Sequence, residues 1–75
     1  MPKIPIVTAT KLFKVLKKKG FILGRIKGSH HVFVRNTDQV SVSVPFHKGR
    51  DLGRGITRSI LKDANISLEE FQALL

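Results

Sequence analysis

The N-terminal part of the chain carries a helical pattern of apolar and polar positions. One face of a helix formed by residues 8–20 gathers four apolar side chains, Ala9, Leu12, Phe13 and Leu16. Thr8 is suited to cap the start of this helix, and Gly20 is suited to the left-handed position after its end. The lysine run 17–19 lies where the helix dipole favours cations, so we interpret it first as a solvated helix end.

The C-terminal third predicts two further helices. Residues 55–64 form the first of them, and Asn65 suits the left-handed position that follows. Its buried side chains are expected to be Ile56, Ile60 and Leu61. Ser67 and Glu70 form a capping box that opens a short last helix. The inward side chains of that helix are expected to be Leu68, Phe71 and either Leu74 or Leu75.

Between the helices, three short runs have the character of β-strands, namely residues 21–26, 30–35 and 40–44. Lys27-Gly28-Ser29 predicts a turn between the first two runs, and residues 36–38 predict a turn between the second and third. Valine and serine alternate strictly in the third run, as in a half-buried strand, and Pro45 ends it. These runs predict a three-stranded antiparallel meander.

The element order is therefore α-β-β-β-α with a short extra C-terminal helix, an α+β fold with its helices on one face of the sheet. A chain of 75 residues buries only about 60% of its unfolded surface, so we expect a thin core in one domain spanning residues 1–75. Residues 46–55 form the longest irregular segment. They are basic and rich in glycine, which makes them a candidate functional loop.

Charge narrows the class of partner. The chain has 14 Lys and Arg against 5 Asp and Glu, a net charge of +9, and no acidic residue precedes Asp38. Such a balance favours a polyanionic partner, and nucleic acid is a better fit than a membrane surface or an acidic protein.

Several protein classes are disfavoured. The chain has no cysteine, so we expect neither disulfides nor thiolate–metal sites, which fits a cytoplasmic protein. No apolar run approaches the roughly 20 residues that span a bilayer. Pro2, Lys3 and Pro5 make the N-terminus unlike a signal peptide. We expect no membrane association.

The candidate chemistry centres on two adjacent histidines, His30 and His31, after the glycine turn. Imidazole is the side chain whose ordinary pKa lies near neutrality, so histidine is the usual carrier of protons in catalysis. Neighbours in a strand point to opposite faces, so His30 shares a face with Val32, and His31 shares one with Phe33. If the valine faces the helices, alternation makes His31 the exposed imidazole. Alternation alone leaves both histidines as candidates.

Residues suited to hold RNA phosphate surround the pair, because cations stabilise its charge and a glycine turn admits close approach. The candidate contacts are Arg25, Lys27, Gly28, Ser29, Arg35, His47 and Lys48. Some also have a purely structural interpretation, in which Gly28 and Ser29 complete a turn and His47 is an ordinary loop residue. Adjacent strand histidines cannot readily chelate one ion, and the five carboxylates are scattered. We therefore expect no metal and no cofactor.

Four segments in this order and spacing resemble the HicA family of mRNA interferase toxins. Residues 27–33 resemble its GSHH hairpin, and residues 42–47 resemble its VTVPxH strand end. Residues 55–62 resemble its GTLRSILK helix, and residues 66–71 resemble its closing GLSxEEF. Two departures are Ile56-Thr57 in place of Thr-Leu, and Asn65 in place of a glycine.

The resemblance implies a fold like that of a double-stranded-RNA-binding domain. It also implies a metal-independent endoribonuclease that cuts single-stranded mRNA, the toxin of a type II toxin–antitoxin system. A HicB-type antitoxin would cover the histidine, and the complex would oligomerise through that antitoxin. The essential histidine of the family maps to His30, with His31 as the second candidate.

Two other classes of function fit the same residues. A non-catalytic RNA-binding module would use the basic surface to grip phosphates and 2′-hydroxyls. An interaction protein would use it only to dock an acidic partner. Loss of RNA cleavage on substitution of a histidine would distinguish the enzyme from both.

Overall fold

The computed structural model describes residues 4–75 of the chain. The elements in chain order are β1 (Val7–Thr8), α1 (Ala9–Lys18), β2 (Ile22–Lys27), β3 (His30–Arg35), β4 (Val40–Pro45), β5 (Asp51–Leu52), α2 (Arg54–Asp63) and α3 (Leu68–Leu74). The predicted α-β-β-β-α order with a short terminal helix is confirmed. Two short strands, β1 and β5, were not expected.

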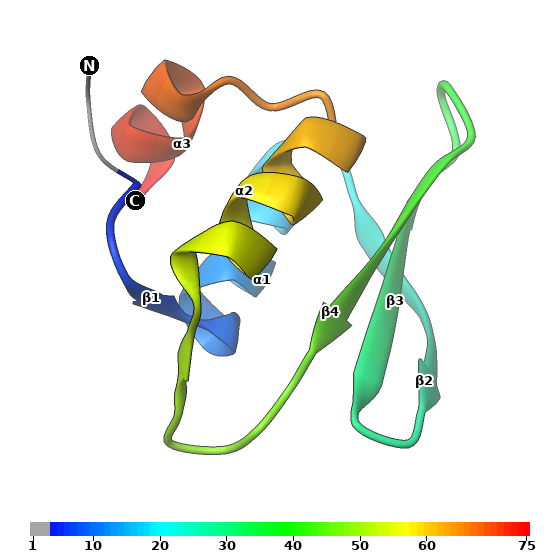
Figure 1. Cartoon of the computed structure of the whole chain (residues 1–75). Helices are drawn as coiled ribbons and strands as arrows, with labels where there is room; N and C mark the ends of the chain where they lie inside the picture. The colour runs from blue at the N-terminus through cyan, green and yellow to red at the C-terminus, as the bar shows by residue number, and fades with distance from the viewer. Residues whose placement is uncertain (1–3) are drawn as a thin grey trace.

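The main sheet is an antiparallel meander with the strand order β2-β3-β4. The helices pack on one side of it and leave the other face uncovered (Figure 1). Strand β5 lies within the segment predicted to be irregular, where Leu52 pairs with Val7 of β1. This pair of short strands ties the loop after β4 to the chain just before α1, so only residues 46–50 remain without regular structure between β4 and β5.

Helix α1 begins and ends as its sequence predicts. The Thr8 side chain accepts a hydrogen bond from the Lys11 N–H at 3.3 Å. At the other end Gly20 has φ +89°, and the Phe21 N–H donates to the Leu16 carbonyl at 2.9 Å. The last lysine of the predicted solvated run, Lys19, is instead paired with Glu70 of α3. That pair links the end of α1 to the C-terminal helix.

The predicted burial of Ile56 in α2 is wrong. Ile56 is 47% exposed, whereas Thr57 is fully buried. The inward face of α2 follows the spacing i, i+3 and i+4 from Thr57, which includes Ile60 and Leu61 and turns Ile56 to solvent. The Thr57 hydroxyl donates to the Gly53 carbonyl at 3.1 Å, so its burial leaves no hydroxyl unpaired.

The ends of the two C-terminal helices match the prediction. Asn65 has φ +58°, the left-handed conformation expected after α2. Ser67 and Glu70 form the capping box of α3, with the Ser67 side chain accepting from the Glu70 N–H at 3.1 Å. Phe71 is buried, and of the two alternatives Leu74 is the half-buried one while Leu75 is exposed.

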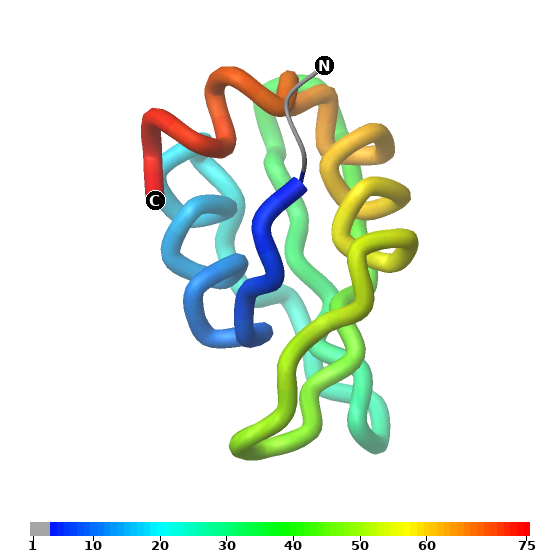
Figure 2. Tube along the Cα trace, turned by 60° about the vertical axis from the view of Figure 1, so that its left-hand side comes forward, coloured from blue at the N-terminus to red at the C-terminus, as the bar shows by residue number. Residues whose placement is uncertain are grey.

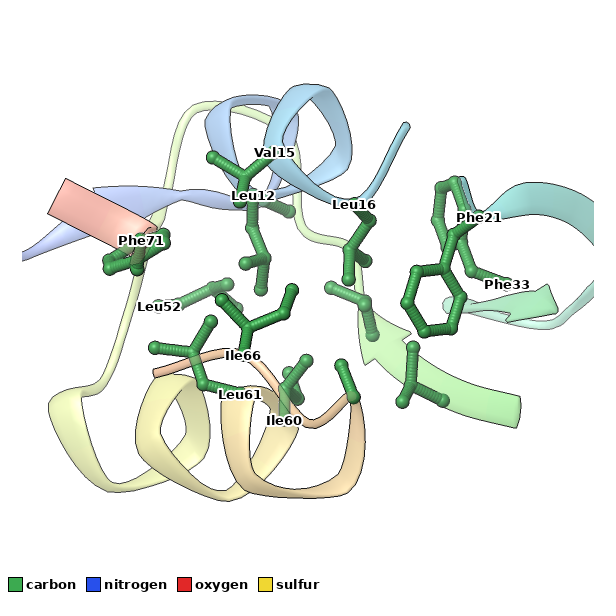
Figure 3. Packing of buried hydrophobic residues seen from close by; sticks show 14 of the residues in the cluster. Leu12, Val15, Leu16, Phe21, Phe33, Leu52, Ile60, Leu61, Ile66 and Phe71 are labelled. Atoms are coloured by element: carbon green, nitrogen blue, oxygen red, sulfur yellow. The ribbon is translucent and has the colours of Figure 1, made fainter. Parts of the chain in front are cut away.

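The core lies between the helices and the inner face of the sheet. Figure 3 shows side chains of α1 facing those of α2 across the core, with Leu12 and Leu16 on one side and Ile60 and Leu61 on the other. The termini of the described chain and α3 lie at one end of the molecule, and the β2–β3 hairpin reaches to the other (Figure 2). The hairpin tip is therefore held by its strands rather than by the helices.

Strand β2 contains a bulge at Gly24. Leu23 pairs with Phe33 and Arg25 pairs with Val32, so Gly24 has no partner of its own. The extra residue shifts the alternation of side chains along the rest of β2. Arg25 and Lys27 consequently lie on the uncovered face of the sheet, the face opposite to that of Phe33.

Candidate functional site

The predicted glycine turn forms the tip of the β2–β3 hairpin. Lys27 pairs directly with His30, which leaves Gly28 and Ser29 as a two-residue loop. Gly28 has φ +59°, and a side-chain carbon built on it meets no atom within 4 Å. Glycine is favoured here by its backbone conformation alone, as in the type II′ turns of hairpins.

His30 is exposed on the uncovered face of the sheet. It lines a shallow hollow there together with Arg25, Lys27, Gly28, Val32, Ser41 and Ser43. Phe33 is buried against the helices, so the alternating Val32 lies on the opposite side of the sheet. His31 would be the exposed imidazole only if Val32 faced the helices. Val32 faces away from them, so the exposed imidazole is that of His30. The hollow contains an imidazole, a guanidinium and an ammonium group, and no carboxylate.

His31 lies on the inner face of the sheet within an aromatic cluster. Its ring is 5.1 Å from the ring of Phe13, stacked at 24°, and 5.1 Å from the ring of Phe46. The Nδ1 atom of His31 is buried without a hydrogen-bond partner among the described residues. Its surroundings are those of a packing residue, half-buried against Phe13 of α1 and Phe46, the residue after β4.

The segment after β4 is tied to the hairpin tip. The Phe46 N–H donates to the Ser29 carbonyl at 2.6 Å, and Pro45 pairs with His30. These contacts bring the start of the loop that carries His47 and Lys48, both exposed, beside the glycine turn. Residues far apart in sequence thus meet at one end of the sheet, with cations and imidazoles contributed by both segments.

Arg35 is the one predicted phosphate contact that lies apart from this group. Its guanidinium donates to both carboxylate oxygens of Asp38, at 3.0 and 2.8 Å, and to the Lys19 and Ala64 carbonyls, at 3.1 and 3.2 Å. It also lies 4.5 Å from the centre of the Phe21 ring. The hydrogen bonds that Arg35 donates to Asp38 raise the pKa of Arg35, and the same bonds lower the pKa of Asp38. Arg35 therefore links β3 to the ends of both main helices.

Two residues of the hollow, Ser41 and Ser43, were not singled out from the sequence. The signal was present in the strict alternation of β4, because Val42 and Val44 are buried and the serines between them must face the other way. Their hydroxyls add hydrogen-bonding groups beside His30.

Within residues 4–75, no three His, Cys, Asp or Glu side chains are grouped closely enough to hold a metal ion. None of the helices in this range has the length and hydropathy needed to cross a membrane.

Comparison with known protein families decides the classification. The family described as HicA toxin of bacterial toxin-antitoxin matches residues 9–66 of the 75-residue chain. The chain belongs to the HicA toxin family. The match runs from the start of α1 to just before α3, so it includes the hairpin histidines and the loop after β4. Membership in a toxin–antitoxin family implies that this HicA toxin has an antitoxin partner. No curated protein matches the chain.

Proposed function

We propose that this HicA toxin is a metal-independent endoribonuclease that cleaves mRNA, with His30 as a proton carrier. The observation that supports the proposal best is the position of His30, exposed in a hollow beside Arg25 and Lys27 on the uncovered face of the sheet. Nucleic-acid substrates require a cationic surface, and cleavage of RNA without a metal requires a group that exchanges protons near neutrality.

The reaction needs two proton transfers. The 2′-hydroxyl loses a proton and its oxygen attacks the adjacent phosphorus, the bond from phosphorus to the 5′-oxygen breaks, and that oxygen leaves with a proton. The products are a 2′,3′-cyclic phosphate and a 5′-hydroxyl. A neutral imidazole at His30 can take the first proton, or its protonated form can supply the second. His47, from the segment beside the hairpin tip, is the candidate for the other transfer.

We assign catalysis to His30 rather than to His31 because His31 is stacked against Phe13 and Phe46 on the covered side of the sheet. A substrate in the hollow would meet only the first of the two imidazoles. His31 then acts indirectly, by packing the end of β4 against β3 so that the hairpin tip and the loop stay together.

The residues that hold the RNA follow from the same geometry. Arg25 and Lys27 would bind phosphates along the hollow, while Gly28 and Ser29 would let the RNA chain approach the turn closely. Lys48 would bind phosphate from the loop side. Arg35, whose guanidinium is engaged within the protein, is left out of this group. Single-stranded mRNA fits a shallow, open site, and the place of action would be the cytoplasm.

We further propose that a HicB-type antitoxin inhibits the toxin by covering His30. An exposed catalytic group in a shallow hollow can be blocked by a partner that needs no deep pocket. Association of the antitoxin with itself would then bring several toxin chains into one oligomeric complex.

The decisive experiment uses purified toxin free of antitoxin and a fluorescent single-stranded RNA, with and without EDTA. Wild-type protein is expected to cut the RNA in both conditions. His30→Ala should lose at least about 100-fold in cleavage rate, while its thermal unfolding and its RNA binding by anisotropy stay close to wild type.

Ser59→Ala, on the exposed surface of α2, serves as the control and should cut at the wild-type rate. If wild-type protein binds RNA but leaves it intact in both conditions, the chain is a non-catalytic RNA-binding module. If His30→Ala cuts normally, another group carries the chemistry.

A further inference from the structure

Strand β2 carries an unusual share of the exposed apolar surface. Among residues 4–75 there are six large hydrophobic side chains with high exposure, and three of them lie on this one strand. They are Ile22, Leu23 and Ile26, at 55%, 43% and 57% exposed. Single exposed apolar residues are ordinary on protein surfaces, but a group of them on one element marks an interaction site.

The backbone of β2 is also available. In the strand order β2-β3-β4, β2 is an edge strand, and within the described residues no strand pairs with its outer side. Edge strands offer a row of N–H and C=O groups to a further strand, and proteins usually protect such edges with charges or bulges. The bulge at Gly24 and the cations Arg25 and Lys27 protect β2 from indiscriminate pairing. They do not cover its apolar side chains.

The apolar side chains of β2 lie on both faces of the sheet. Leu23 and Ile26 pair with Phe33 and His31 on the side of the helices, yet they stay exposed because the helices do not extend over the edge strand (Figure 1). Ile22 pairs with Val34, on the uncovered face with the two cations. A partner that adds a strand here would contact apolar groups on both sides of the sheet.

We propose that β2 is the docking edge for the antitoxin, which would add a strand whose apolar side chains alternate with Asp or Glu. The proposal rests on the proposed function for its assumption that the antitoxin acts on this toxin directly. Main-chain hydrogen bonds to β2 supply affinity, and side chains opposite Leu23 and Ile26 supply apolar contact. Carboxylates opposite Arg25 and Lys27 supply charge complementarity.

A second copy of this chain is a poorer occupant of the same edge. Pairing β2 with β2 would bring two copies of Arg25 and Lys27 together, in a protein whose net charge is already +9. An acidic strand relieves this repulsion, whereas self-association increases it. Charge therefore selects a partner of opposite sign.

Docking at this edge also explains how the antitoxin reaches the catalytic group. Lys27, the last residue of β2, pairs directly with His30. A strand bound along β2 ends one strand away from the imidazole, so the polypeptide that follows it can fold over the hollow. The edge would hold the antitoxin, and the adjoining segment would block the site.

The test uses this toxin chain and its HicB-type antitoxin, expressed and purified separately. Titration calorimetry measures the Kd for wild type, for Ile26→Ser and for the matched control Ile56→Ser, which changes an isoleucine of similar exposure on α2. Ile26→Ser is expected to raise the Kd about tenfold or more, and Ile56→Ser less than about twofold. Hydrogen exchange should show new protection in residues 22–27 when the antitoxin binds, and RNA cleavage by Ile26→Ser alone should match wild type.

The outcomes separate the two proposals. If wild type binds the antitoxin, Ile26→Ser binds equally well and residues 22–27 gain no protection, the docking edge lies elsewhere and the proposed function stands. If free toxin sediments as a dimer that protects residues 22–27, the occupant is a second copy and the inference is wrong. A third outcome is that wild type does not cut RNA but binds the antitoxin tightly, and Ile26→Ser loses that binding. This outcome would overturn the proposed nuclease activity and support the docking edge.

Discussion

His30 and His31 are neighbours in sequence, yet their imidazoles lie on opposite faces of β3. His30 is exposed beside Arg25 and Lys27, whereas His31 is stacked on Phe13 at 5.1 Å with its Nδ1 atom buried and unpaired among the described residues. One pair of identical side chains thus divides into an exposed group and a group packed against aromatic rings.

The first prediction concerns the buried imidazole. His31→Phe is expected to stabilise the protein by about 1 kcal/mol, because it keeps a ring in contact with Phe13 and Phe46 and removes a buried unpaired nitrogen. His31→Ala is expected to destabilise it by about 1–3 kcal/mol through loss of ring contacts. Chemical denaturation measures both. RNA cleavage by His31→Phe should stay at the wild-type level, and its loss would make His31 a catalytic group.

The second prediction concerns the backbone of the hairpin tip. Gly28→Ala is expected to cost about 1–2 kcal/mol, because the left-handed conformation at φ +59° is unfavourable for a residue with a side chain. Gly55→Ala is the control, since Gly55 lies inside α2 with open space around it. There alanine should stabilise the protein by about 0.5–1 kcal/mol. Equal effects at both positions, measured by thermal unfolding, would contradict the proposed turn strain.

The third prediction separates two arginines that look equivalent in sequence. Arg35→Ala should destabilise the fold by about 1–3 kcal/mol through loss of charge-assisted hydrogen bonds. Arg25→Ala should leave stability nearly unchanged, weaken RNA binding, and reduce the slope of log K against log salt by about 0.7–0.9. Denaturation and anisotropy titrations at several salt concentrations provide the two readouts. If a folded Arg35→Ala variant showed the reduced slope and Arg25→Ala kept the wild-type slope, Arg35 rather than Arg25 would be the phosphate contact.

The fourth prediction concerns acid. The hydrogen bond from Lys19 lowers the pKa of Glu70 below its ordinary value, and the Ser67 backbone N–H adds to the effect. A carboxyl group whose pKa is lower in the folded state stabilises the fold above its unfolded pKa. That contribution is lost as pH falls through the lowered pKa. The free energy of unfolding should therefore decline as the solution is acidified from about pH 5 downward.

Glu70→Gln removes part of that decline. Its unfolding free energy should depend less steeply on acid pH than that of wild type, and the difference between the two proteins should be largest near neutrality. Glu69→Gln is the matched control, because Glu69 lies next to it in α3 and forms no ion pair among residues 4–75. If both variants follow the wild-type curve, the pairing of Lys19 with Glu70 contributes nothing to folding.

Local signals in the sequence were sufficient for most of the fold. Thr8, Gly20 and Asn65 end or begin helices for reasons that depend only on neighbouring backbone groups, and the structure confirms each of them. The alternation in β4 likewise needs no knowledge of the rest of the chain. Such features are predictable because the interactions that cause them are local.

Features that depend on tertiary contacts were not predictable in this way. The inward face of α2 is set by what the helix packs against, so Thr57 is buried and Ile56 is not. Arg35 reaches Asp38 nearby but also the carbonyls of Lys19 and Ala64, which are distant in sequence. The sequence identified both histidines as candidates but could not decide which face of β3 the helices would cover.

The unpaired Gly24 of β2 has a consequence for how this protein can tolerate change. It determines the charge of the uncovered face of the sheet, since regular pairing of the same residues without the bulge would turn Arg25 and Lys27 to the side of the helices. If residue 24 instead paired with Val32, the two faces would exchange from that residue onward, and both cations would lie away from His30.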